Sequence, residues 1–350
     1  MEFIINGIQQ IGIGVLEAKT VFNWYRKNLG FDILVFEDTA IASLMTQYTA
    51  NNAEERYAML SLNMNGGGGL EIWQFKNRTP EPPARSVQLG DLGINAMKVR
   101  SRDIEATYVH LKMQRLEFVT EIFEGRHFFF KDPWNNWVQV VSDNYTFSKS
   151  KCISGGISGA FIGVSDMEAS LDFYQKVLGY NLIVNDNEGI FPDLLGLPGG
   201  GSTFRRVLLK HDERDTGGFG QLYGPSQIEL FQTLDRTPSL IYKDRLWGDL
   251  GFIHLCFDVN GMDAIRYTAE NFGVPFTVDS AKSFDMGNAA GRFGYIEDPD
   301  GTLIELVETH KVPILKKLGI NIDLKNRNPR KPLPKWMVSI MRVHRVNSDL

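Results

Sequence analysis

His254 and Glu305, in the last third of the sequence, are predicted to lie on strand faces from which an imidazole and a carboxylate can act together. Apolar residues alternate along residues 252–259, so His254 faces away from the side of that predicted strand which packs into the core. The same alternation in residues 303–307 turns Glu305 away from Ile304 and Leu306. A buried imidazole and carboxylate need a partner, because an unpaired buried charge is costly. A divalent cation would satisfy both side chains, and so would an arginine.

Two further polar positions belong to this argument. Gln10 shares a strand face with Gly12 and Gly14, which leaves open volume beside its amide. Cys256 shares the face of His254, but the pattern places no histidine base beside it, so we expect a buried and unreactive thiol.

The strands that carry these residues belong to a chain that repeats itself. The segment Glu71-Ile-Trp-Gln-Phe-Lys-Asn-Arg-Thr-Pro80 matches Glu229-Leu-Phe-Gln-Thr-Leu-Asp-Arg-Thr-Pro238, and a Gly-Asp-Leu-Gly sequence follows each at the same spacing. Upstream, Trp24-Tyr-Arg-Lys-Asn-Leu-Gly-Phe31 matches Phe173-Tyr-Gln-Lys-Val-Leu-Gly-Tyr180. A third match closes each half, at Lys131-Asp-Pro and Glu297-Asp-Pro. Three matches in the same order indicate a tandem duplication.

The duplication predicts two domains, at residues 1–150 and 151–312, joined by a polar linker near 148–156, with a C-terminal extension at 313–350. Each half contains two units in which a strand precedes a helix and further strands follow. In the first unit, residues 11–15 are a predicted strand and residues 18–29 a predicted helix with Gly30 as its C-terminal cap. Later strands are predicted at 57–62 and 70–75. The second unit predicts a strand at 94–99, a helix at 104–114 and a last strand at 137–141. The chain is therefore predicted to be an α+β protein of four βαβββ modules.

Composition narrows the class of protein. The 350 residues carry a net charge of -5, which gives no reason to expect nucleic-acid binding. The chain has only two cysteines, Cys152 and Cys256, which do not indicate a disulfide framework. The N-terminus lacks the features of a secretory signal, and no apolar run is long enough to cross a bilayer. We therefore expect a cytoplasmic protein, while the oligomeric state stays open.

The combination of a first strand, Phe-Tyr-x-x-x-Leu-Gly-Tyr, Asp-Pro-Asp-Gly and a final Ile-Glu-Leu resembles the vicinal-oxygen-chelate superfamily, which includes glyoxalase I, extradiol dioxygenases and bleomycin resistance proteins. The resemblance covers residues 5–310 and implies half-barrel cups built from paired modules. It also implies metal positions on the first and last strands of each module. These positions hold Gln10 and Glu71, Ala96 and Gln139, Gly159 and Glu229, and His254 and Glu305 in the four modules.

The resemblance allows two pairings of the modules. If the first and fourth meet, Gln10, Glu71, His254 and Glu305 form the metal set of a glyoxalase I, and the other pair has no metal set. If consecutive modules meet, the second half offers Glu229 as an alternative ligand beside His254 and Glu305. Either set suits one divalent ion such as Zn, Ni, Co, Mn or Fe, and the sequence does not choose among them.

Three functions follow from the resemblance. The first is a metal-dependent lyase or isomerase of glyoxalase I type, acting on a small substrate with vicinal oxygens, in which Glu305 moves a proton as the catalytic residue. The second is an extradiol-type dioxygenase, which the loss of a first-strand histidine at Gly159 disfavours. The third is a metal-free protein that binds small molecules, as the drug-resistance members do.

Two further features are predicted to be structural. The repeated Arg-Thr-Pro corners at Arg78 and Arg236 are expected to be turns with salt bridges rather than substrate clamps. In the basic C-terminal extension, residues 335–346 have helical spacing, with Trp336, Ile340 and Val343 on one side. We expect this segment to dock on the acidic body of the protein, with a helix on a membrane surface as the alternative.

Overall fold

The computed structural model describes residues 2–148, 152–214, 216–280, 284–286, 289–315, 320–325 and 327–346. Residues 149–151 of the predicted linker, and Lys316 and Lys317 of the extension, lie outside the described residues. Within the described residues, no helix is long and apolar enough to cross a membrane.

The strands form two curled sheets, and each sheet combines strands from both halves of the chain. The first has ten strands, with the main order β14-β16-β17-β13-β1-β4-β3-β2, while β15 pairs with β16 and β18 with β17. Its strands are β1 (Ile4–Gly14), β2 (Ile33–Ile41), β3 (Glu55–Leu62), β4 (Gly69–Phe75), β13 (Gly251–Asn260), β14 (Val278–Asp279), β15 (Phe284–Met286), β16 (Ala289–Glu297), β17 (Leu303–Leu315) and β18 (Ile320–Asp323).

The second sheet has eight strands in the order β10-β11-β12-β9-β5-β8-β7-β6. They are β5 (Gly93–Ser101), β6 (Glu117–Phe118), β7 (His127–Lys131), β8 (Trp137–Ser142), β9 (Ser154–Gly163), β10 (Leu182–Gly189), β11 (Phe204–Lys210) and β12 (Gln227–Thr233). The antiparallel pairs β1–β13 and β5–β9 hold the modules together. The first module therefore shares a sheet with the fourth and the second with the third, which decides the pairing that the sequence left open.

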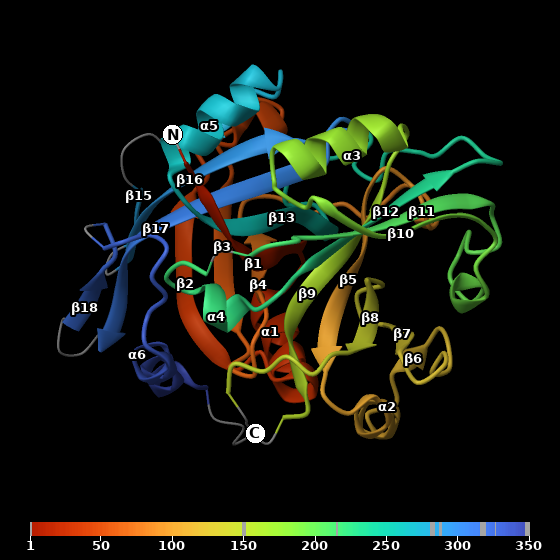
Figure 1. Ribbon diagram of the computed structural model, residues 1–350, viewed down its shortest axis with the longest axis horizontal. Helices are drawn as coiled ribbons and strands as arrows, with labels where there is room; N and C mark the ends of the chain where they lie inside the picture. Colours follow the sequence, from red (N-terminus) through yellow and green to blue (C-terminus); the bar gives the residue numbers. More distant parts are fainter. Residues whose placement is uncertain are drawn as a thin grey trace.

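The helices pack on the outside of this frame. They are α1 (Ala18–Leu29), α2 (Ile104–Met113), α3 (Met167–Lys176), α4 (Gly220–Tyr223), α5 (Met262–Asn271) and α6 (Lys335–Ser339), with 3-10 helices at Thr46–Tyr48, Pro192–Leu194 and Ile340–His344. Helices α3 and α5 lie at one end of the molecule, and α1 and α2 at the other (Figure 1). The prediction for α1 is confirmed to the residue, because Gly30 takes the left-handed conformation (φ 73°) that ends the helix.

The hydrophobic core joins both sheets. Leu255, Phe257 and Val259 of β13 are fully buried in one cluster with apolar residues of β1, β5 and β9. This confirms the strand parity inferred from the sequence. The side chains on the opposite face of β13, including His254, consequently face the hollow of the first sheet.

The repeated corner motifs exchange ion pairs between the two halves. Arg78 Nη1 lies 2.9 Å from Asp249 Oδ1, and Arg236 Nη1 lies 2.9 Å from Asp91 Oδ1. Both aspartates are buried, so each arginine neutralises a carboxylate of the other half. The structural role expected for the Arg-Thr-Pro corners is confirmed.

The other two repeated motifs tie the sheets together within each half. Tyr25 of α1 donates a hydrogen bond to Asp132 Oδ2 (2.5 Å), in the turn between β7 and β8. Its counterpart Tyr174 of α3 donates to Asp298 Oδ2 (3.0 Å), in the turn between β16 and β17. The Phe-Tyr and Asp-Pro motifs thus serve packing between the modules of each half.

The C-terminal extension docks on the body of the protein, as expected. Arg345 Nε lies 3.0 Å from Asp32 Oδ2, and the backbone N–H of Val346 donates to the carbonyl of Asp32. The predicted docking face is wrong: Val338 and Met341 are buried, whereas Trp336 and Val343 are 65% and 58% exposed. The segment docks through its other side, on which Val338 and Met341 lie three residues apart, because these side chains pack in an apolar cluster with Phe219 and Leu222.

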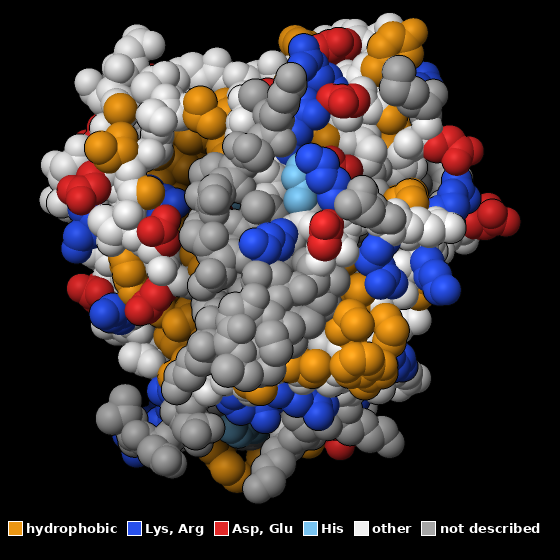
Figure 2. Space-filling model, turned by 90° about the vertical axis from the view of Figure 1, so that its left-hand side faces the viewer, with side chains coloured by type: hydrophobic (Ala, Val, Ile, Leu, Met, Phe, Trp, Pro, Cys, Tyr) orange, Lys and Arg blue, Asp and Glu red, His pale blue; other side chains and the backbone are white. Residues whose placement is uncertain are grey.

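The face of the molecule that carries β17 and β18 mixes charged and apolar side chains. In its lower part, Lys and Arg side chains form a band beneath a patch of hydrophobic ones (Figure 2).

Candidate metal centre

Four polar side chains from four strands meet in the hollow of the first sheet. His254 Nε2 of β13 lies 3.2 Å from Glu71 Oε2 of β4 and 3.2 Å from Glu305 Oε2 of β17. Gln10 Nε2 of β1 lies 3.3 Å from the same oxygen of Glu71 and 3.4 Å from that of Glu305. The structure therefore brings together the four residues that the pairing of the first and fourth modules predicts.

Strand register explains why these side chains meet. Gly12 of β1 lies opposite His254 and also beside Glu71, while Cys256 lies opposite Gln10 and beside Glu305. A Cβ atom on Gly12 would lie 2.5 Å from Cε1 of His254, which is closer than atoms can approach. Gly12 therefore makes room for the imidazole because it has no side chain. This agrees with the open volume that the sequence predicts beside Gln10.

Within the described structure, the buried Oε1 atom of Gln10 has no hydrogen-bond partner, and His254 Nε2 contacts its two carboxylates as an ion pair without the alignment of a good hydrogen bond. Buried polar atoms without a good hydrogen bond are rare in folded proteins, because each one carries a desolvation penalty. Glu71, His254 and Glu305 each direct one ligand atom to a common point, since these atoms lie within 4.8 Å of one another. Three oxygen donors and one imidazole nitrogen fit a divalent ion of hard or borderline character.

The electrostatics of the cluster reflect its burial and its excess of carboxylates. Burial lowers the pKa of His254, but Glu305 and Glu71 outweigh this effect and raise its pKa above the usual value. Burial, helped by the charge of Glu71, raises the pKa of Glu305 to about 7, although His254 acts in the opposite direction. Two carboxylates in one buried site thus favour a compensating positive charge, which can be a bound proton or a metal cation.

Tyr295 of β16 is a member of the site that the sequence analysis missed. It is buried, pairs in register with Glu305, and its hydroxyl lies 3.4 Å from Nδ1 of His254. When Nδ1–H donates to this hydroxyl, the lone pair of Nε2 is left toward the carboxylates, as a metal ligand requires. The alternation of Phe293 and Tyr295 with Gly294 and Ile296, just before the Asp-Pro motif, would have placed Tyr295 on the face of the hollow.

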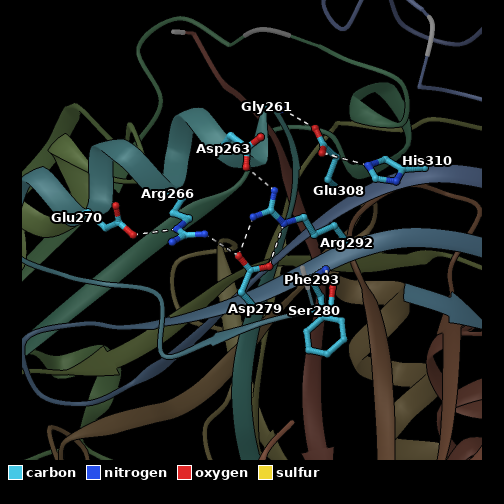
Figure 3. A network of polar contacts seen from close by, with 10 residues as sticks. All are labelled: Gly261, Asp263, Arg266, Glu270, Asp279, Ser280, Arg292, Phe293, Glu308 and His310. Carbon is cyan, nitrogen blue, oxygen red and sulfur yellow. Dashed lines mark hydrogen bonds and ion pairs between the residues drawn. The ribbon is translucent and has the colours of Figure 1, made fainter. Parts of the chain in front are cut away.

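A cavity of about 440 Å³ opens onto the cluster. Gln10, Glu71 and Glu305 line it, and its remaining walls are mostly aromatic and aliphatic side chains. At its rim, Arg292 of β16 is held by Asp279 and by Asp263 of α5, within a network that continues through Arg266 to Glu270 (Figure 3). The arrangement can present a small substrate to the four polar groups while most of the wall excludes water.

The corresponding hollow of the second sheet holds a different structure. Glu229, the alternative ligand, lies in this sheet and pairs with Lys98 and Arg206 instead of joining His254. The other positions are Ala96, Gln139 and Gly159, of which the first packs in an apolar cluster. Phe129, Phe161 and Phe231 fill that cluster together with Leu194 and Leu197, from the connection between β10 and β11. The consecutive pairing that would have used Glu229 is not the one adopted.

Cys256 fits the expectation of an unreactive thiol. It is fully buried, and burial beside Glu305 raises the pKa of its thiol well above the usual value. Its Sγ donates to Oε1 of Gln9. The thiolate form that would act as a nucleophile is therefore disfavoured.

A buried carboxyl group beside the centre gives a testable pH dependence. Asp258 accepts hydrogen bonds from Asn6, Gln9 and Thr309, yet burial raises its pKa to about 7. Between pH 5 and 7 the native protein therefore keeps a proton that the unfolded chain has released, and stability falls as pH rises. We expect Asp258→Asn to reduce the slope of the unfolding free energy by up to about 1.4 kcal/mol per pH unit. Urea unfolding at pH 5, 6 and 7 measures this slope, and an unchanged slope would contradict the raised pKa.

Comparisons with known proteins agree with this architecture. Residues 7–140 and 156–306 match the model of the Glyoxalase/Bleomycin resistance protein/Dioxygenase superfamily. The chain belongs to this superfamily. Because the two matches cover both halves, the tandem duplication consists of two copies of the glyoxalase-type unit, and the expected fold class is confirmed.

Two lactoylglutathione lyases match part of the chain at modest sequence identity. The lactoylglutathione lyase of Pseudomonas aeruginosa is 32% identical over 149 residues, 41% of this chain and 77% of that protein. That of Schizosaccharomyces pombe is 24% identical over 215 residues, which are 59% of this chain but only 63% of the relative, less than two thirds of its length.

Solved structures share the fold at low identity. Glyoxalase I from Zea mays matches with a TM-score of 0.51 at 12% identity, over 88% of this chain and 92% of that one. A candidate dioxygenase from Bacillus subtilis matches with a TM-score of 0.55 at 14% identity, over 87% and 86% of the two chains. At such identities the superfamily fold is shared, and the choice of activity depends on the site.

Proposed function

We propose that this protein is a divalent-metal-dependent isomerase or lyase of the glyoxalase I type, acting on a small substrate with vicinal oxygens. The observation that carries the proposal is the convergence of Gln10, Glu71, His254 and Glu305 in one buried cluster, in which Oε1 of Gln10 has no hydrogen-bond partner. The two relatives described as lactoylglutathione lyases support the same class of reaction.

Glu71, Glu305 and His254 would hold the metal through two oxygens and one imidazole nitrogen, and Gln10 would add a third oxygen once its amide is turned so that Oε1 replaces Nε2 toward the carboxylates. A divalent ion in such a site acts as a Lewis acid that stabilises negative charge developing on substrate oxygens. Tyr295 positions His254 from the other side of the ring, at 3.4 Å from Nδ1. Gly12 leaves the space in which the ring lies.

Glu305 is the proposed catalytic residue. It lines the cavity, so its carboxylate can reach a bound substrate, accept a proton from one carbon and return it to the neighbouring one. The largely apolar wall keeps bulk water from competing for that proton. The isomerisation needs no co-reactant, because the proton that leaves one carbon is delivered to the next.

The dioxygenase alternative is less well supported. Such enzymes hold iron with two histidines and one carboxylate. Among the described residues, the cluster that can hold a metal contains one histidine, His254, with Glu71 and Glu305.

The proposal predicts that Glu305→Gln slows proton transfer by about a hundred- to ten-thousandfold. The reaction to follow is conversion, by the Zn- or Ni-loaded protein, of the adduct of phenylglyoxal and 2-mercaptoethanol into the mandelyl thioester. Mass spectrometry in deuterated water would show whether the transferred hydrogen exchanges with solvent. Glu188→Gln, at an exposed position of β10, is the matched control and should leave the rate unchanged. Equal rates for Glu305→Gln and the wild type would contradict the role assigned to Glu305.

A further inference from the structure

We propose that the substrate of this site has an apolar, ring-containing body rather than the peptide of a glutathione conjugate, and that Met341 of the C-terminal extension limits its length. The inference rests on the proposed function for the position of the reacting oxygens.

The walls favour an apolar body. The cavity that Glu71 and Glu305 line is also lined by the aromatic side chains of Phe36, Trp73, Trp247 and Phe293. Trp73 and Trp247 form an edge-to-face pair with ring centroids 4.4 Å apart. Aromatic surfaces of this kind bind flat apolar groups well, since burial and ring contacts act together. The volume of about 440 Å³ lies within the usual range of sites for small molecules.

The rim offers few free cationic side chains that could pair with the carboxylates of a peptide. Glutathione conjugates carry two carboxylates, and each would need a cationic partner. Arg56 lies 3.1 Å from Asp38 and also donates to its carbonyl. Arg292 makes two hydrogen bonds to Asp279 and a third to Asp263 (Figure 3).

Among the described residues that line the cavity, these pairings leave Lys311 as the cation without a carboxylate partner. Its side chain is exposed. The cavity therefore matches a substrate with at most one carboxylate, held near the mouth.

Two segments that are not strands or helices of the βαβββ pattern add to the cavity wall: the connection between β11 and β12, which contains α4, and the C-terminal extension. Phe219 and Leu222, in and beside α4, pack in one apolar cluster with Met341 and Val338 of the extension. Met341 lines the cavity and is 7% exposed. The extension lies beyond the residues that match the superfamily model, so this chain has added its own end wall to the shared cup.

The test compares three ligands: catechol, 3-phenylcatechol and S-lactoylglutathione. The two catechols share a head with vicinal oxygens and differ only in the apolar ring. Binding is followed by calorimetry and by quenching of tryptophan fluorescence, on Zn-loaded and on chelator-treated protein. We expect the phenyl group to tighten binding roughly ten- to a hundredfold, and S-lactoylglutathione to bind more weakly than 3-phenylcatechol.

Variants of the end wall make the test specific. Met341→Trp should remove most of the gain from the phenyl group and leave catechol binding unchanged. Val343→Trp, on the exposed side of the same segment, is the control and should keep the gain. Thermal unfolding of both variants establishes that they are folded, and Met341→Ala, which shortens the same side chain, should keep or increase the gain.

The outcomes separate this inference from the proposed function. No gain from the phenyl group, or tighter binding of S-lactoylglutathione than of 3-phenylcatechol, would overturn the inference even if the protein binds metal. A gain that is the same with and without metal, while neither catechol responds to the metal, would sustain the apolar cavity and count against the metal-dependent function.

Discussion

Replacing Gly12 with alanine is expected to lower metal affinity by about a hundredfold or more, although no ligand atom is removed. The added Cβ would lie 2.5 Å from Cε1 and 2.7 Å from Nε2 of His254. Gly12 belongs to a central strand between β13 and β4, so its backbone has little room to retreat. The imidazole must move instead, and Nε2 then no longer meets Glu71 and Glu305.

Competition with a metal-sensitive dye would measure the affinity of the Gly12→Ala variant. Overpacking of this kind should also cost about 1–3 kcal/mol of stability. Gly201→Ala is the matched control, because a Cβ at that position meets no atom within 4 Å. Unchanged metal affinity in Gly12→Ala, with the fold intact, would show that the position of His254 does not matter to the metal.

Replacing Glu229 with glutamine is expected to destabilise the protein by about 3–5 kcal/mol without affecting metal binding. Glu229 pairs with Lys98 and Arg206 in the second sheet, and Lys98 is only 3% exposed. Burial already lowers the pKa of Lys98, and the carboxylate of Glu229 is what offsets this effect. Without that carboxylate the ammonium group must be buried unpaired or lose its proton.

The internal repeat provides a control for Glu229→Gln, which is the same substitution at Glu71. Glu71 occupies the position in the first module that Glu229 occupies in the third, yet Glu71 faces His254 instead of a lysine. Glu71→Gln should therefore weaken metal binding and change stability much less than Glu229→Gln does. Urea unfolding and metal titration of both variants would test this reversal, and similar behaviour of the two would contradict the different roles assigned to them.

The sequence predicts much of the fold because each module carries its own hydrophobic pattern. The alternation around His254 and Glu305 identifies the face of the hollow, and Gly30 marks the end of α1. Which modules pair is not contained in these patterns, since β1 and β9 present similar apolar faces to a partner strand. The choice depends on contacts between distant segments, such as the ion pair of Arg78 with Asp249.

Other features of the site depend on tertiary structure in the same way. Glu71 and Glu229 stand in equivalent positions of the repeat, and only the neighbouring side chains distinguish a candidate ligand from a partner of Lys98. The end wall at Met341 comes from a segment that docks through Val338 and Met341, and only contacts with the distant residues Phe219 and Leu222 select that side. Composition and spacing did not predict that this segment reaches the cavity.

The most direct test of the central claim is the metal content of the protein, purified without chelator or nickel affinity resin, beside a His254→Ala variant. Elemental mass spectrometry should find about one equivalent of a transition metal in the wild type and far less in the folded variant. If the wild type holds no metal, even after incubation with Zn, Ni, Co, Mn and Fe(II), then Gln10, Glu71, His254 and Glu305 form only a buried polar cluster, and the proposed chemistry is wrong.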